Sequence, residues 1–422
     1  MKISVIYASL PKRNPGMISV NRAFGSWLRW SGIAAEVSEY QLGKRHSAWD
    51  SPPAVELYGR LDEALDADVV IYWGDWLQMR HYHEDLARAF HRGRWVEAKP
   101  SQPPGSLAET ARVIREHLLL EGRPIADLKK TLLIGGTLAL SSPQDLALAS
   151  YSEPLKRLIT HSALVLMRDL PSANIARSMR VENPVDPCCG CDCAMLLDTD
   201  IIEGPETSKT GGTATAFLGR NRGAKSRRYT SFVRDLCASA QVAPSWIDWF
   251  PEKQASRRLI PRAVRRLQQA FPRLGESRDP GHESAEGTSL SDILSAVRAS
   301  RFTITDTYHL AVNCWNLGIP AVCIAGTVDS LPWSVNSGAR HAWRDKRYEF
   351  YSMIEAMPYF VHASELAAAM TRRSRLRQLA DLLVSGDDQT FIAMQRIAQL
   401  RDRTKMRIRE TVRVVSELKG PE

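Results

Sequence analysis

The chain has 422 residues and a net charge of +9 at neutral pH, and its 44% hydrophobic and 24% charged residues are ordinary for a globular protein of two or three domains. No apolar run approaches the roughly 18 residues of a membrane span, and the N-terminus lacks the features of a signal peptide. These features argue against an integral membrane protein and favour a cytoplasmic enzyme or binding protein. The basic residues are scattered, and no nucleic-acid-binding module is recognisable, so we expect an acidic small molecule or an acidic membrane surface as the partner of this charge.

Strand and helix patterns alternate in the first half of the chain. The predicted strands are KISVIYA (2–8), AAEVSEY (34–40), ADVVIYWG (67–74), KTLLIGGTL (130–138) and SALVLMRD (162–169). The predicted helices are SVNRAFGSWLRWSG (19–32), AVELYGRLDEAL (54–65), LAETARVIREHLLLEG (107–122), the stretch 143–160 and PSANIARSM (171–179). This alternation predicts a mostly parallel, doubly wound sheet in a first domain, residues 1–185.

A second alternation follows a break in the pattern at 186–212, which we interpret as the crossing between two domains. Its predicted elements are the strands ATAFLG (214–219) and SWIDWF (245–250), the helices YTSFVRDLCASAQ (229–241) and SLSDILSAVRAS (289–300), and a basic helix between them. We expect a second Rossmann-like domain over 213–363, then Arg- and Leu-rich helices over 364–422. The predicted fold class is therefore α/β, with two Rossmann-like domains facing a central cleft and a helical C-terminal segment.

The stretch FTITDTYHLAVNCWNLGIPAVCI (302–324) is typical of a strand–helix–strand unit. FTIT predicts a buried strand, the next residues suit a helix N-terminus, and Gly318 ends the helix. His309, Asn313 and Asn316 share one polar face of this helix. His309 is thus expected where the carboxyl end of a strand meets a helix N-terminus, which is where ligands bind in open α/β sheets.

A cysteine cluster, PCCGCDC, lies in the predicted crossing segment; its cysteines are Cys188, Cys189, Cys191 and Cys193. The C-x-x-C spacing of Cys188 and Cys191 suits zinc or a redox pair. No second C-x-x-C and no nearby histidine completes a usual zinc set, so we favour a turn rich in small side chains and expect no metal. The pair His81 and His83 is also expected at the surface rather than at a metal.

With both halves in view, the chain resembles the polysaccharide pyruvyl transferase family, whose fold is similar to that of the two-domain GT-B glycosyltransferases. Short motifs in residues 1–360 carry the resemblance: ADVVIYWGDWLQ (67–78), SALVLMRDLPS (162–172), DCAMLL (192–197), the stretch 295–324 and RDKRYEF (344–350). His309 falls on the family's histidine, and Lys346 is the best match to a downstream basic site. The chain departs from the family at Thr307, where the family has arginine, and at Gly16–Met17, where it has Gly-Asp.

The resemblance implies that phosphoenolpyruvate is the donor and that a sugar of a cell-surface polysaccharide or glycoconjugate, either free or lipid-linked at the membrane surface, is the acceptor. His309 is then the expected acid and base, and Asp75, at the end of the strand 67–74, a base or a ligand of the acceptor hydroxyl. Substrate binding is expected from Thr307 and from Arg168, although a structural contact with Asp169 explains Arg168 equally well. Anion binding is expected from the two arginines of FLGRNRG. These arginines are Arg220 and Arg222, and Lys346 is expected to bind the substrate with them.

Aromatic residues beside Asp75 complete the predicted site. Trp73 and Trp76 either stack on a sugar ring or belong to the core. Two other functions stay open from the sequence. One is a GT-B glycosyltransferase whose helix N-terminus holds the diphosphate of a nucleotide sugar, which Thr307 suits equally well. The other is a non-enzymatic protein that binds an anionic glycan or nucleic acid. The sequence does not predict the acceptor sugar, the linkage or the oligomeric state.

Overall fold

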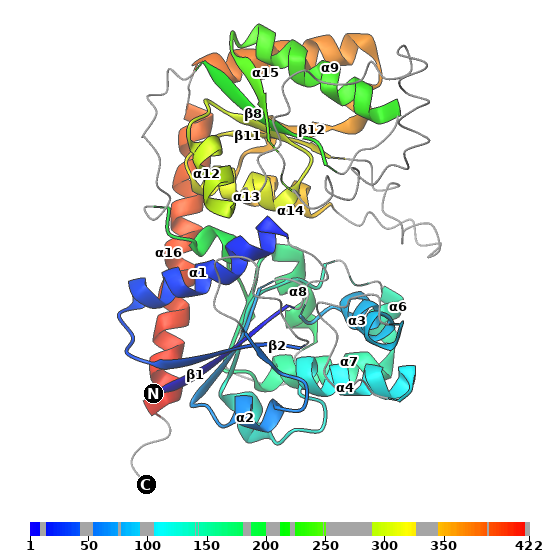
Figure 1. Cartoon of the computed structure of the whole chain (residues 1–422), viewed down its shortest axis with the longest axis vertical. Helices are drawn as coiled ribbons and strands as arrows, with labels where there is room; N and C mark the ends of the chain where they lie inside the picture. Colours follow the sequence, from blue (N-terminus) through cyan, green and yellow to red (C-terminus); the bar gives the residue numbers. More distant parts are fainter. Residues whose placement is uncertain are drawn as a thin grey trace, which may run out of the picture.

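The computed structural model describes residues 1–8, 14–42, 54–74, 77–92, 105–139, 141, 143–179, 187–199, 212–219, 224–247, 249, 289–325, 345–385 and 388–417. It has two lobes, each built on one parallel sheet, with helices around both (Figure 1). The α/β prediction with two Rossmann-like units and a helical C-terminal segment is confirmed.

The first sheet has seven strands in the order β3-β2-β1-β4-β5-β6-β7, all parallel. Their bounds are β1 Lys2–Tyr7, β2 Glu36–Gln41, β3 Val55–Glu56, β4 Val69–Trp73, β5 Thr131–Gly136, β6 Leu164–Met167 and β7 Cys188–Cys189. The central strands β4, β5 and β6 are buried throughout. Continuous apolar sequence is what a strand covered on both faces requires, which is why these runs were recognisable.

The helices of this lobe are α1 Pro15–Ser31, α2 Leu61–Leu65, α3 Arg80–Arg92, α4 Leu107–Leu119, α5 Ile125–Lys129, α6 Pro143–Ala147, α7 Ala149–His161 and α8 Leu170–Ser178, followed by the 3₁₀ helix η2 Cys193–Leu196. The helix predicted over 54–65 is wrong. Gly59 has a φ of 77°, a left-handed conformation that interrupts helical geometry, so this stretch forms β3, a turn and the short α2. The helix predicted over 143–160 is divided at Leu148, whose backbone is extended.

The second sheet has five parallel strands in the order β12-β11-β10-β8-β9. Their bounds are β8 Thr213–Phe217, β9 Ala243–Trp246, β10 Thr303–Thr305, β11 Ala321–Ala325 and β12 Phe360–His362. The helices are α9 Ala224–Ser239, α12 Leu290–Arg298, α13 Tyr308–Asn316, α14 Lys346–Met353, α15 Ala369–Ser385 and α16 Asp388–Glu417, with the 3₁₀ turns η6 Met357–Tyr359 and η7 Ala363–Leu366. The predicted basic helix between β9 and α12 lies outside the described residues.

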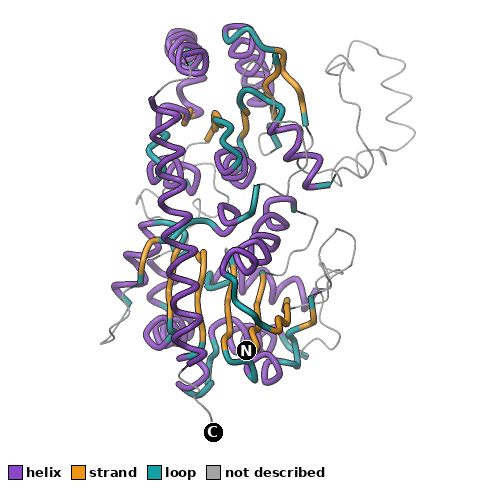
Figure 2. The backbone as a smooth tube through the Cα atoms, turned by 90° about the vertical axis from the view of Figure 1, so that its left-hand side faces the viewer, coloured by secondary structure: helices purple, strands orange, loops and turns teal. Residues whose placement is uncertain are grey.

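Helix α16 packs against both lobes. It runs along the side of both lobes, and its own C-terminal end lies beside the first lobe (Figures 1 and 2). The indole of Trp27 in α1 donates a hydrogen bond to the carbonyl of Lys405 in α16, at 3.2 Å. One hydrophobic cluster extends from the first sheet through η2, α13 and α16 into the second sheet. The contact between the lobes is therefore a packed core. Within the described residues, no helix combines the length and the apolar character needed to cross a membrane.

Candidate functional site

His309 lies in the first turn of α13, directly after β10, and its side chain is buried between the two lobes. The backbone of Gly16 in α1 lies directly against it. A Cβ atom at Gly16 would be 2.4 Å from the Cβ and 2.5 Å from the Nδ1 of His309, closer than any real side chain allows. Glycine is therefore required at position 16 for α1 and α13 to approach this closely.

Asp192 connects the side chains of the two lobes. It caps η2, where its Oδ1 accepts a hydrogen bond from the Ala194 N–H at 2.9 Å. Its Oδ2 is 3.8 Å from the Nε2 of His309 and 3.8 Å from the Nη1 of Arg168. All three side chains are buried, with exposures of 2% for Asp192, 5% for His309 and 2% for Arg168. Three ionisable side chains thus lie together in the interface, where low polarity strengthens each electrostatic interaction.

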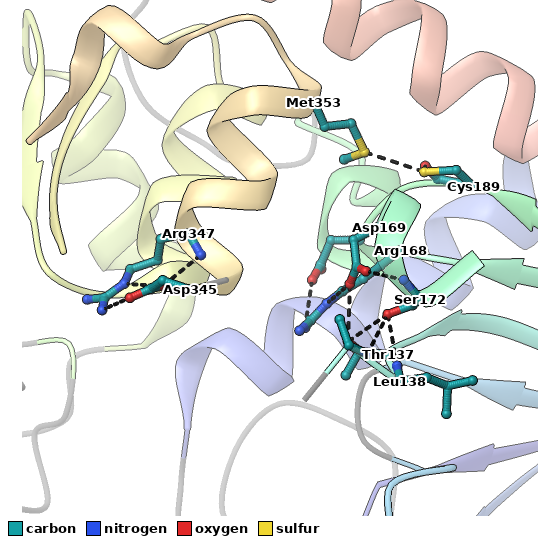
Figure 3. Close-up of polar contacts among 12 residues, drawn as sticks. Thr137, Leu138, Arg168, Asp169, Ser172, Cys189, Asp345, Arg347 and Met353 are labelled. Carbon is teal, nitrogen blue, oxygen red and sulfur yellow. Dashed lines mark hydrogen bonds and ion pairs between the residues drawn. The ribbon is translucent and has the colours of Figure 1, made fainter. Parts of the chain in front are cut away.

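Arg168 follows β6, and a hydrogen-bond network fixes the residues next to it (Figure 3). The Asp169 carboxylate accepts from the Arg168 Nε at 3.4 Å and caps α8 by accepting from the Ser172 N–H at 2.8 Å. The Ser172 hydroxyl in turn accepts from the backbone N–H groups of Leu138 and Ala139, both at 2.9 Å. Asp169 and Ser172 therefore hold the carboxyl ends of β5 and β6 together and orient Arg168.

Tyr308 brings a further cation into the cluster. The Arg168 guanidinium lies 5.0 Å from the centre of its ring, and the Lys346 ammonium lies 4.6 Å from the same centre. The Tyr308 and His309 rings are 5.1 Å apart in an edge-to-face arrangement. Arg168, Lys346 and His309 thus gather around one aromatic ring at the N-terminus of α13, where the helix dipole adds positive potential.

Arg347 supports the segment that carries Lys346. Its Nη1 donates to the carbonyl of Asp306 at 2.7 Å and to that of Ile324 at 3.4 Å, at the ends of β10 and β11. Its Nε donates to the Asp345 carboxylate at 2.8 Å, as Figure 3 shows. Burial would raise the pKa of Asp345, but the hydrogen bonds and charge of Arg347 outweigh it and lower that pKa. Arg347 is a structural brace that places Lys346 beside Tyr308.

Thr307 is the N-cap residue of α13, but its side chain makes no capping hydrogen bond. Its N–H donates to the Thr305 hydroxyl at 3.0 Å, and its hydroxyl donates to the Asp306 carboxylate at 3.2 Å. The same carboxylate oxygen of Asp306 accepts from the Gly219 N–H at 3.0 Å. Asp306 therefore links the ends of β8 and β10 beneath the site.

The polar face of α13 belongs mainly to the interface between the lobes. The Asn313 side-chain amide donates to the Ser19 hydroxyl of α1 at 3.0 Å, and that of Asn316 donates to the Leu197 carbonyl at 3.0 Å. Buried amides need such partners, because an unsatisfied polar group in the interface is costly. Only His309, at the N-terminal end of this face, reaches the charged cluster.

Trp73, one of the two tryptophans predicted to bind substrate, is a core residue. It is fully buried, its Nε1 donates to the Val20 carbonyl at 2.8 Å, and its ring packs edge-on against Phe24 at 5.3 Å. A sugar has no access to its face, so the stacking role is wrong for Trp73. The other predicted site residues Asp75, Trp76, Arg220 and Arg222 lie outside the described residues.

The surface position expected for His83 is also wrong. His83 is 4% exposed, its Nε2 is 2.6 Å from the Leu77 carbonyl, and burial lowers the pKa of His83 to about 4. His81 is more exposed and lies 3.1 Å from Asp145. His81 and His83 do not form a pair, because His83 belongs to the core whereas His81 contacts Asp145.

The four clustered cysteines lie at the edge of the first sheet. Cys188 and Cys189 form β7, whereas Cys191 and Cys193 are buried, and none of the four is in a disulfide. Burial raises the pKa of Cys189 to about 11 and that of Cys191 to about 12, so both are thiols at neutral pH. Among the described residues, no three His, Cys, Asp or Glu side chains are grouped to hold a metal ion.

Sequence reasoning assigned no role to Asp192, Tyr308 or Gly16. Two signals pointed to them: Asp192 opens the motif 192–197, and Gly16 stands at a position where the family has glycine. Tyr308 carries no signal besides its place beside His309. What brings the three together is the packing of α1, η2 and α13.

Comparison with known proteins finds a family resemblance in the part of the chain that contains most of this cluster. The model of the polysaccharide pyruvyl transferase family matches residues 144–327. The chain resembles polysaccharide pyruvyl transferases. The matched stretch includes Arg168, Asp192 and His309, and it supports the predicted enzyme class, a transferase. No curated protein sequence matches the chain.

Solved structures that align with the chain share little sequence with it. A putative UDP-N-acetylglucosamine 2-epimerase from Listeria monocytogenes has 13% identity and a TM-score of 0.48, and the alignment covers 100% of this chain and 98% of that one. The alpha,alpha-trehalose 6-phosphate synthase from Burkholderia multivorans has 11% identity and a TM-score of 0.48, over 99% of this chain and 100% of that one. A UDP complex of MnaA from S. aureus has 13% identity and a TM-score of 0.45, over 99% and 96%.

Proposed function

We propose that this protein transfers a pyruvyl group from phosphoenolpyruvate to two hydroxyls of a sugar in a polysaccharide or glycoconjugate. The observation that carries the proposal is the convergence of Arg168, Lys346 and His309 at the N-terminus of α13, with Asp192 beside His309. Arg168 and Asp192 come from the first lobe, and His309 and Lys346 come from the second. The match to the pyruvyl transferase family covers three of these four residues.

The cations suit the donor. Phosphoenolpyruvate carries a carboxylate and a phosphate, and the two need cationic partners at separate positions. The planar guanidinium of Arg168 matches either anion with two hydrogen bonds, whereas Lys346 acts as a compact charge. The free N–H groups and the dipole at the start of α13 favour phosphate. Arg220 and Arg222 stay predicted as further ligands of the donor.

His309 is suited to move the protons that this reaction requires. Its imidazolium would donate a proton to the methylene carbon of phosphoenolpyruvate, which becomes a methyl group and leaves positive charge on the neighbouring carbon. Two sugar hydroxyls form bonds to that carbon, and its bond to the phosphate oxygen breaks. One hydroxyl proton returns to His309, and the other leaves on inorganic phosphate. No cofactor enters this balance.

Asp192 would hold the imidazole ring in place and stabilise its charged form, as a buried carboxylate does for a catalytic histidine. The acceptor sugar would enter from the first lobe, where Asp75 stays predicted as a base or hydroxyl ligand. We place the reaction in the cytoplasm, at the inner membrane surface when the acceptor is lipid-linked.

One observation favours a second candidate, a glycosyltransferase that uses a nucleotide sugar. Thr307 replaces the family's arginine, and its side chain does not cap α13. A diphosphate therefore fits the same helix N-terminus without that arginine.

Thermal shift separates the two donors. Wild type, His309→Gln and Asp192→Asn would be heated with phosphoenolpyruvate or with UDP-, GDP- or CMP-sugars. Stabilisation by phosphoenolpyruvate, reduced in His309→Gln, is the expected result, and phosphate release with a sugar acceptor should be at least about 100-fold slower in both variants. Stabilisation by a nucleotide sugar alone would overturn the donor assignment in favour of glycosyl transfer.

A further inference from the structure

A groove beside the charged cluster is not used in the proposed chemistry. It has a volume of about 750 Å³ and lies between α8 and β7 of the first lobe, α14 of the second, and α16. It adjoins the candidate site on two sides: its residues Leu170 and Pro171 follow Arg168 and Asp169, and Glu349 lies one helical turn after Lys346. Figure 3 shows two residues of this groove facing one another, Cys189 of the first lobe and Met353 of the second.

Arginines dominate the charge of the groove. Arg396, Arg403 and Arg407 line it from α16, and Arg177 lines it from α8. The α16 arginines recur at intervals of seven and four residues, which places them on one face of the helix. At the rise of an α-helix they span roughly 17 Å, with steps of about 10 Å and 6 Å. The groove thus presents an extended row of cations rather than one compact anion site.

Two of these arginines make contacts only to uncharged groups within the described part of the chain. The Arg403 Nη2 donates to the Cys189 carbonyl at 3.2 Å, and the Arg407 Nη1 contacts the Cys188 thiol. Both side chains are exposed, so their charge is available to a ligand. Arg396, by contrast, lies 3.8 Å from the Glu355 carboxylate.

The other lining residues indicate which polyanion fits. Glu349 and Glu355 add two carboxylates, which accept hydrogen bonds from sugar hydroxyls but repel a dense row of phosphates. None of the described lining residues is aromatic, so the groove offers no platform on which nucleic-acid bases could stack. Widely spaced cations combined with carboxylates match a glycan that carries one acidic group on some of its sugars.

We infer that this groove binds an acidic oligosaccharide segment and that the acceptor of the transfer is an acidic glycan. The role of this glycan as the acceptor rests on the proposed function, but its binding in the groove can be measured without turnover. Arg403 and Arg407 contact the carboxylates of the glycan, and the carboxylates of Glu349 and Glu355 accept from its hydroxyls.

The test compares a short oligogalacturonate, a neutral malto-oligosaccharide of equal length and a short single-stranded RNA, each titrated into the full-length protein by calorimetry. The variants are Arg403→Gln/Arg407→Gln and, as a matched control, Arg373→Gln/Arg413→Gln, which removes two exposed arginines outside the groove. We expect wild type to prefer oligogalacturonate, the groove variant to bind it about ten-fold more weakly, and the control to stay within about two-fold. Added salt should weaken this binding.

Equal affinity for the neutral sugar, equal losses in the two double variants, or tighter groove-dependent binding of RNA would each overturn the inference. The outcome is independent of the donor, because phosphoenolpyruvate is absent from the titration. If phosphoenolpyruvate stabilises the protein but the groove binds no acidic glycan, only the inference of an acidic acceptor is refuted. If the groove binds the glycan but phosphoenolpyruvate has no effect, only the assignment of phosphoenolpyruvate as the donor is refuted.

Discussion

Replacing Gly16 by alanine tests whether the contact between α1 and α13 positions His309. The added Cβ would lie 2.4 Å from the His309 Cβ, whereas carbon atoms in contact are normally about 3.5–4.0 Å apart. The separation must therefore grow by more than about 1 Å. Because the clash is with the Cβ atom of His309, which moves only with the backbone, the helix carrying His309 must shift as a whole.

The consequence for the site follows from its distances. The Nε2 of His309 is 3.8 Å from Asp192, so a shift of about 1 Å away from Asp192 would break this pair. Misplacing a catalytic group by that distance lowers the reaction rate about 100-fold. Overpacking of this kind also costs about 1–3 kcal/mol of stability. Gly16→Ala should therefore lower the melting temperature and reduce turnover about 100-fold.

Gly25→Ala is the matched control in the same helix. Its Cβ would meet only the tip of the flexible Arg29 side chain, at 3.7 Å, and alanine is the better helix former by about 1 kcal/mol. Both variants would be assayed by calorimetric melting and by release of phosphate from phosphoenolpyruvate. Gly25→Ala should melt at or above the wild-type temperature with wild-type turnover. Should Gly16→Ala instead behave like Gly25→Ala in both assays, the close contact would not position His309.

Two further substitutions test the burial of His83, which was expected at the surface, and of Trp73, which was predicted in the site. Because the pKa of His83 is lowered to about 4, the unfolded chain binds more protons than the folded one between about pH 6.5 and pH 4, and stability falls as the pH drops through this window. At about 1.36 kcal/mol per pKa unit, wild type should lose about 2 kcal/mol more than His83→Asn between pH 7 and pH 5 in denaturant unfolding, and equal losses would contradict this. Trp73→Phe removes the hydrogen bond to Val20 and should cost about 1–3 kcal/mol without changing sugar affinity, whereas weaker sugar binding at unchanged stability would return Trp73 to the site.

The strands and the position of His309 were predictable because they depend on local sequence. Buried parallel strands need continuous apolar runs, and such runs mark β4, β5 and β6 directly. The place of His309 follows from the residues that end a strand and begin a helix, all within a few positions of it. The helix predicted over 54–65 failed because its apolar spacing suits a helix, while Gly59 adopts a left-handed conformation that the spacing does not reveal.

The partners of His309 were decided by tertiary structure alone. Asp192 is far from both Arg168 and His309 in the sequence, and it meets them only because η2 packs between α1 and α13. Likewise, an aromatic residue at the end of a strand looks the same in sequence whether it faces a ligand or the core. Trp73 belongs to the core because α1 packs against it. Most strands and helices could be predicted from the sequence, since backbone preferences are local, but the interruption at Gly59 could not. The close approach of the two lobes decided which charges meet, because those contacts join residues that the chain keeps far apart.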